Sequence, residues 1–154
     1  MYSLFLFLHS FIRWLVLAGL IYSLFKGIYG WKNKGHFTSS DRIARQVTAS
    51  IVHVQFLVGV ILYLFSPLTI YFRAHTSEAM NHSDLVFFGI THVVLMLAAV
   101  VVITIGSIKS KRAIKDVKKF SSMTIYYAIG FLIILISIPW PISPFSERPL
   151  FRFF

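Results

Sequence analysis

The sequence predicts an all-α membrane protein, a bundle of four transmembrane helices. Hydrophobic residues make up 57% of the chain and charged residues 13%, whereas a soluble domain has about 45–50% apolar and about 25% charged residues. The chain also contains four apolar runs, each close to the roughly 20 residues that a helix needs to cross a bilayer. With 154 residues, the whole chain, 1–154, is expected to form a single transmembrane domain.

The apolar runs place the spans at about residues 4–25, 47–65, 85–105 and 120–140. The first run lacks the charged start of a secretory signal and is too long for one, so we expect it to remain as a helix. The loops between the spans are then 26–46, 66–84 and 106–119. The tail beyond residue 140 contains three further prolines and is expected to be extended.

The positive charges predict the orientation of the bundle. The chain has a net charge of +10, and its basic residues are concentrated in the loops 26–46 and 106–119. Cytoplasmic loops of membrane proteins are enriched in lysine and arginine, so both loops are expected in the cytoplasm and both termini on the periplasmic or outer side. This pattern also explains the charge without nucleic acid, which we do not expect as a partner; the expected surroundings are the lipid bilayer.

Four ionisable residues interrupt the predicted spans: His9 and Arg13 in the first, His53 in the second and His92 in the third. Such residues are costly inside a bilayer and usually mark a functional site. From a rise of about 1.5 Å per residue, His9 and His92 both lie on the outer side of the bilayer centre, about 8–9 Å and 4–5 Å from it. His53 lies about 4–5 Å on the cytoplasmic side.

Histidines on separate helices at similar depth indicate a b-type haem, whose iron takes an imidazole on each face of the ring. The haem iron would be held by two of His9, His53 and His92. We favour His92 with His9, and His53 is the alternative partner. Arg13 follows His9 by four residues, so it lies on the same helix face and could pair with a haem propionate. Alternatively, the histidines only hydrogen-bond across helices and fix their contacts.

The loop 66–84 contains a second group of potential ligands, His75, Met80 and His82. Ligands of this kind suit copper or zinc, although their spacing matches no defined metal motif. The chain has no cysteine, which excludes disulfides, iron–sulfur clusters and covalently attached haem. It also has no phosphate-binding glycine loop and no nucleophile elbow. No catalytic residue is therefore predicted.

The sequence resembles a small group of bacterial inner-membrane proteins known as cytochrome b-like. The similarity runs along the whole chain, through Leu8-His9-Ser10, Arg13-Trp14-Leu15, His53, Gln55, Gly59, Tyr63, His92, Met96, Ile103-Thr104-Ile105-Gly106 and Ser137-Ile138-Pro139-Trp140-Pro141. The family has an acidic residue directly before the third histidine, where this chain has Thr91, so no carboxylate at that position can orient His92. The resemblance implies a multi-pass protein of the bacterial inner membrane that binds haem and transfers electrons.

These observations predict a membrane-bound electron-transfer protein with haem b. It would exchange electrons with quinol, with other membrane redox proteins or within a larger complex. It would then act as an electron carrier or an oxidoreductase subunit rather than as a stand-alone enzyme, and a quinone is a possible second cofactor. The alternatives are a non-catalytic accessory subunit of a larger membrane complex and a protein that handles copper through the loop 66–84.

Overall fold

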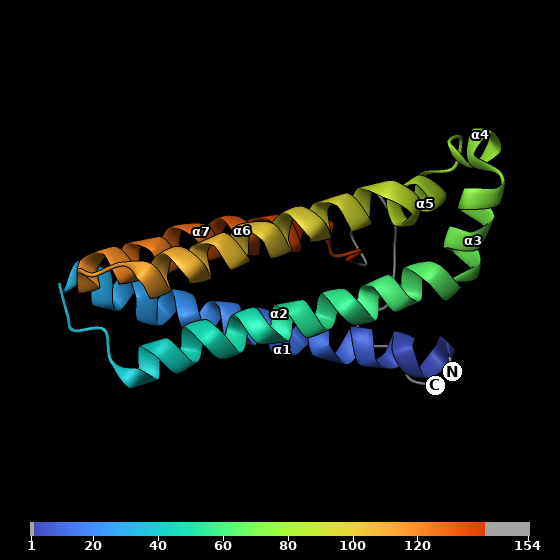
Figure 1. Ribbon diagram of the computed structural model, residues 1–154. Coiled ribbons are helices and arrows are strands. Elements are labelled where there is room, and N and C mark those ends of the chain that lie inside the picture. Colours follow the sequence, from blue (N-terminus) through green and yellow to red (C-terminus); the bar gives the residue numbers. More distant parts are fainter. Residues whose placement is uncertain (1, 141–154) are drawn as a thin grey trace.

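The computed structural model describes residues 2–140, and all its regular elements are helices (Figure 1). The long helices are α1 (Tyr2–Lys32), α2 (Ser39–Phe65), α6 (His92–Arg112) and α7 (Asp116–Ser137). A short α5 (Ser83–Val86) and a π-helical turn η1 (Phe87–Thr91) lead directly into α6, and α3 (Pro67–Ala74) and α4 (Thr76–Ala79) connect α2 to α5. Within the described part, four continuous helical segments are long and apolar enough to cross a membrane. The predicted all-α fold with four candidate transmembrane helices is confirmed.

The helices extend further than the predicted spans, which corrects the loop boundaries. The segments 26–46 and 106–119 were expected to be loops, but only residues 33–38 and 113–115 are non-helical there. The start of α2 is fixed by a capping box, in which Thr38 and Asp41 each accept a hydrogen bond from the other's backbone N–H. Hydropathy marks only the apolar part of a helix, so it misses such polar ends. The tail beyond residue 140, expected to be extended, lies outside the described residues.

The four long helices pack around the bundle in the order α1, α2, α6, α7, with α7 also against α1 (Figure 1). We call the end that carries residues 33–38 and 113–115 the basic end, and the end that carries Tyr2 and α3 the terminal end. α7 is shorter than α1, with 22 residues against 31. At about 1.5 Å per residue it is roughly 13 Å shorter. It starts at the basic end and stops at Ser137, so fewer helices enclose the terminal half.

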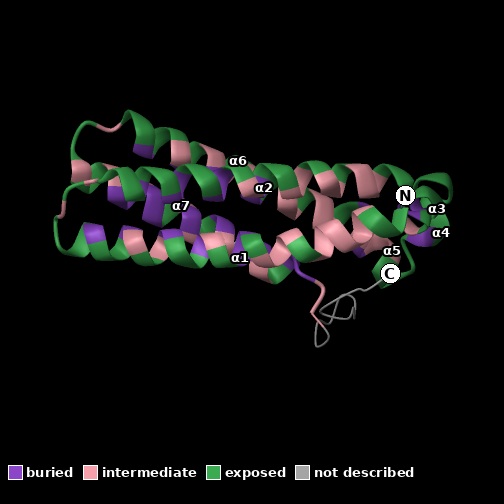
Figure 2. Cartoon of the chain, turned by 90° about the horizontal axis from the view of Figure 1, so that it is seen from below, coloured by how far each residue is buried: buried purple, intermediate pink, exposed green. Residues whose placement is uncertain are grey.

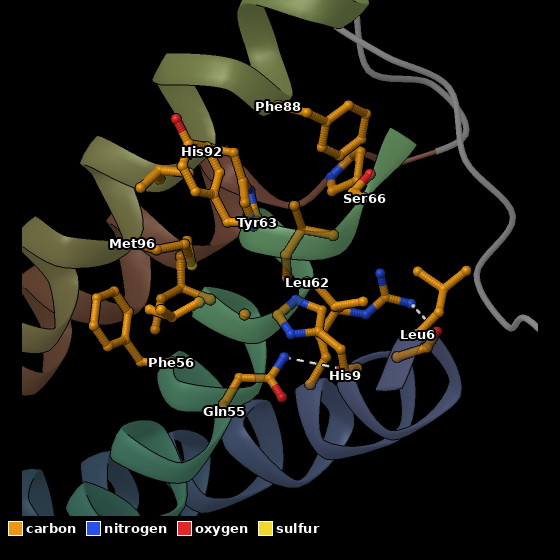
Figure 3. Close-up of a pocket in the computed structure, with 18 of the residues that line it drawn as sticks. Leu6, His9, Gln55, Phe56, Leu62, Tyr63, Ser66, Phe88, His92 and Met96 are labelled. Carbon is orange, nitrogen blue, oxygen red and sulfur yellow. Dashed lines mark hydrogen bonds between the residues drawn. The ribbon is translucent and has the colours of Figure 1, made fainter. Parts of the chain in front are cut away.

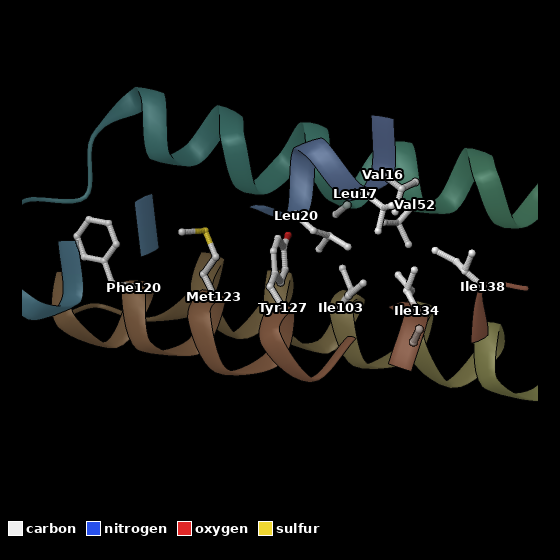
Figure 4. Close-up of a cluster of buried hydrophobic side chains, with 12 residues drawn as sticks. Val16, Leu17, Leu20, Val52, Ile103, Phe120, Met123, Tyr127, Ile134 and Ile138 are labelled. Carbon is white, nitrogen blue, oxygen red and sulfur yellow. The ribbon is translucent and has the colours of Figure 1, made fainter. Parts of the chain in front are cut away.

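The hydrophobic core lies mainly in the basic half (Figures 2 and 4). Every buried residue of α1 is at or after Val16, and the largest completely buried side chains are those of Tyr127, Phe120, Leu20, Ile103 and Met123. Many large apolar side chains face outward instead, among them Phe25 and Leu57. An outward apolar surface is what a helix in lipid requires.

Small residues allow the helices of the basic half to approach closely. A Cβ at Gly106 would overlap the Cβ of Tyr126, and a Cβ at Gly130 would overlap the side chain of Ile103. Both glycines lie where α6 meets α7. This is the usual means by which membrane helices gain van der Waals contact.

Hydrogen bonds between helices reinforce this half. The buried hydroxyl of Tyr127 donates to the backbone carbonyl of Arg45 at 2.6 Å, and the Arg45 guanidinium donates to the carbonyl and the hydroxyl of Ser107 at 2.8 and 2.9 Å. Thr48 donates to the carbonyl of Gly19 at 3.0 Å. These bonds join α7 to α2, α2 to α6 and α2 to α1, so the basic half is held on several sides.

Candidate functional site

A cavity of about 250 Å³ lies in the terminal half of the bundle, between α1, α2 and α6. Its wall also includes Ile134 of α7, and Ile138 and Pro139, which follow that helix. α7 ends at Ser137, beside the cavity. Most of its wall is apolar, and its polar side chains include Arg13. His9, Gln55 and His92 are further polar side chains of the wall (Figure 3). A mostly apolar cavity with a few converging polar groups is typical of a ligand-binding site.

Two of the three predicted histidine ligands meet across this cavity. The ring centres of His9 on α1 and His92 on α6 are 6.4 Å apart, and the ring planes are inclined by 68°. Metal–nitrogen bonds to imidazole are about 2.0–2.1 Å long, so two imidazoles on opposite sides of one metal have ring centres about 6–6.5 Å apart. The spacing of the pair therefore suits one shared metal ion.

His92 has a fixed orientation. Its Nδ1 is 2.8 Å from the backbone carbonyl of Ser137. A carbonyl oxygen only accepts hydrogen bonds, so Nδ1 carries the proton. Nε2 of the neutral ring then has the free lone pair. The ring also lies against Phe87 and Phe88, with centre distances of 5.6 and 6.2 Å. A histidine ligand commonly donates the N–H of its second ring nitrogen to a carbonyl or carboxylate. This chain has Thr91 in place of an acidic residue before His92, and the Ser137 carbonyl is the acceptor instead.

A π-helical turn precedes His92 and is held from two sides. The hydroxyl of Tyr63, near the end of α2, donates to the backbone carbonyl of Gly89 at 3.1 Å. The ring of Phe72, on α3, packs where Gly89 would carry a Cβ. π-helical turns are rare and occur often at functional sites. The sequence did not predict this turn or the role of Tyr63, because no residue pattern specifies a π turn.

His9 is less constrained than His92. Its Nδ1 is buried without a hydrogen-bond partner among the described residues. Its ring lies close against Gly59 on α2, since a Cβ there would lie 3.3 Å from Cε1 of His9. Gln55 binds only the backbone at this position, donating from its amide to the His9 carbonyl at 2.9 Å. The Gln55 Oε1 is also buried without a partner.

Arg13 provides a positive charge in the cavity wall. It lies one turn after His9 on α1, as predicted, and its guanidinium contacts the hydroxyl of Ser10 at 3.5 Å. The guanidinium also lies over the ring of Trp14, 5.6 Å from its centre. A cation at the edge of an otherwise apolar cavity favours a ligand that carries an anionic group.

The structure does not bring His53 to the cavity. Its side chain is exposed on α2, and its Nε2 forms a 2.9 Å hydrogen bond with the hydroxyl of Thr104 on α6. The Thr104 hydroxyl itself donates to the carbonyl of Val100, so it accepts from His53. This arrangement is a contact between helices of the kind that polar residues make in membranes.

The residues proposed for copper or zinc lie around α4. His75 stacks on the ring of Tyr71, with a centre distance of 4.6 Å. A hydrogen bond to Glu78 raises the pKa of Tyr71 above its ordinary value. Within residues 2–140, no group of three or more His, Cys, Asp or Glu side chains is placed to hold a metal ion.

Comparison with known proteins adds no identity: no family model, curated protein or solved structure matches the chain. The site must therefore be interpreted from its own geometry. It offers two imidazoles at the spacing of one shared metal, a cation and apolar walls.

Proposed function

We propose that this chain binds one b-type haem in the cavity of the terminal half, and that His9 and His92 would hold its iron. The observation that carries the proposal is the 6.4 Å separation of the two ring centres across a mostly apolar cavity. The fixed Nδ1–H of His92 leaves Nε2 as its donor atom.

The other groups of the cavity suit a porphyrin. Apolar side chains such as Phe56 and Met96 would contact the ring, and Arg13 would pair with a propionate. The cavity of about 250 Å³ is below the roughly 300–1,000 Å³ of most ligand pockets, so side chains of its wall must turn aside to admit a haem.

The bound haem would supply one-electron chemistry, and the chain would position it and tune its potential through the two histidines and the burial of the ring. The protein is then an electron carrier or redox subunit that exchanges electrons with quinol or a membrane partner. With the basic end in the cytoplasm, the haem lies nearer the outer face, in the inner membrane of a bacterium. This is also the function implied by the resemblance to the cytochrome b-like group.

The test is a reduced-minus-oxidised optical spectrum, with a pyridine haemochrome assay, of the chain purified in detergent. We expect a b-type spectrum and one haem per chain. His92→Ala and His9→Ala should change the spectrum or lose the haem, and His53→Ala is the matched control that should keep both. A colourless, folded protein, even when haem is supplied, would refute the proposal.

A second candidate is an accessory subunit without a cofactor, in which polar residues only fix helix contacts. The hydrogen bonds of His53 with Thr104 and of Gln55 with the His9 carbonyl favour it. This candidate predicts that the chain purifies colourless with a larger membrane complex.

A further inference from the structure

The two histidines of the cavity differ in how firmly the protein holds them. His92 follows the π turn and is bound to the Ser137 carbonyl through Nδ1. The π turn is held by Tyr63 and Phe72. Four separate elements, α2, α3, η1 and α7, thus determine where the ring of His92 lies.

His9 is held by α2 through its backbone carbonyl, which accepts from the Gln55 amide, but its ring nitrogens are not fixed in the same way. Its Nδ1 has no partner among the described residues, whereas Nδ1 of His92 is bound to a carbonyl. It lies in the part of α1 that precedes Val16, where no residue is fully buried. Segments with few buried contacts open locally at low free-energy cost, so the ring of His9 can rotate or withdraw while the rest of the bundle stays folded.

Resting on the proposed function, we infer that His9 is an exchangeable ligand and that the site binds a small neutral diatomic molecule, such as carbon monoxide, on the His9 side of the haem. His92 would continue to hold the haem, and His9 would give up its place to the diatomic molecule, so that one bond would break as the other forms. No electron is transferred in this exchange once the iron is ferrous. The apolar wall of the cavity suits an uncharged molecule of this size.

The asymmetry also affects the strength of the two ligands. A histidine that donates its second N–H to a carbonyl is a better electron donor than one that does not. Only His92 of the pair has such a bond in the described part of the chain. Competition by an external ligand therefore acts first on His9.

The experiment adds carbon monoxide to the dithionite-reduced, haem-loaded protein and records the optical and resonance Raman spectra. We expect a carbon monoxide complex whose photoproduct gives the same iron–histidine band as ferrous His9→Ala, because both retain His92. His9→Ala should bind carbon monoxide about tenfold faster or more, since no internal ligand has to leave first. His53→Ala should behave as the unchanged chain.

The outcomes separate this inference from the proposed function. A haem-loaded protein that binds no carbon monoxide, or a photoproduct that matches His92→Ala, overturns the exchange at His9 and leaves haem binding intact. The absence of any haem refutes both.

A measurement on the haem-free protein gives a second, independent readout. In ¹⁵N spectra of the histidine rings, His92 should show a single tautomer with the proton on Nδ1, and His9 should show averaging between tautomers. The His92→Ala variant identifies which ¹⁵N signal belongs to His92. Equal tautomer behaviour of the two rings would contradict the difference in how firmly the protein holds them.

Discussion

The basic half of the bundle and the terminal half are built from the same helices but packed in opposite ways. The basic half contains most of the core, close contacts at Gly106 and Gly130 and hydrogen bonds that join several helices. The terminal half contains a cavity with ionisable side chains and no fully buried residue of α1. α7 ends at Ser137, beside this cavity. One half thus supplies the stability that allows the other to remain hollow.

The largest effect should come from filling a close contact in the basic half. Gly106→Ala places a Cβ against the Cβ of Tyr126, which cannot rotate away, so α6 and α7 must separate. We expect a loss of about 1–3 kcal/mol in the free energy of unfolding. Unfolding in mixtures of detergent and dodecyl sulfate measures it. A neutral Gly106→Ala would contradict the tight packing of this half.

Removing one buried hydroxyl from the same half should have a smaller effect. Tyr127→Phe deletes the hydrogen bond to the Arg45 carbonyl but keeps the ring in the core. The expected cost is about 0.5–1.5 kcal/mol, the usual net worth of one hydrogen bond. The same unfolding assay applies, and Tyr22→Phe, on an exposed residue, is the control that should change nothing.

In the terminal half, Tyr63→Phe tests the support of His92. It removes the hydrogen bond to the Gly89 carbonyl, and the expected loss of stability is at most about 1 kcal/mol. The haem spectrum or midpoint potential should nevertheless shift, since the π turn that carries His92 loses one of its restraints. A variant with reduced stability and an identical spectrum and potential would assign Tyr63 a purely structural role.

The smallest loss of stability is expected for Gly59→Ala, in direct contrast to Gly106→Ala. The new Cβ would lie 3.3 Å from Cε1 of His9, and the His9 ring can give way into the cavity. We expect a stability change within about 0.5 kcal/mol together with a changed rate of carbon monoxide binding. A stability loss as large as that of Gly106→Ala would show that the terminal half is packed as tightly as the basic half.

The sequence predicted the fold well because hydropathy determines how many helices can cross a membrane. It also paired His9 with His92 by depth, and the structure places these two residues together. It could not place His53, since depth along a helix says nothing about its rotation, and His53 faces Thr104 rather than the cavity.

Other parts of the site depend on contacts between distant segments. The carbonyl of Ser137 orients His92, and Tyr63 holds the π turn. A backbone carbonyl has no signature in the sequence, and a tyrosine near a helix end resembles an ordinary residue of the membrane interface. The polar ends of α1 and α6 were assigned to loops for a similar reason, because hydropathy does not detect charged helical turns.

The most direct test of the central claim, that His9 and His92 share one metal centre in the terminal half, is low-temperature electron paramagnetic resonance of the oxidised, haem-loaded protein. We predict a low-spin signal of two imidazole ligands with strongly inclined planes, given the 68° between the rings. The signal should persist in His53→Ala and disappear in both His9→Ala and His92→Ala. A high-spin signal in the unchanged chain, or a bis-imidazole signal that survives His92→Ala, would contradict the account.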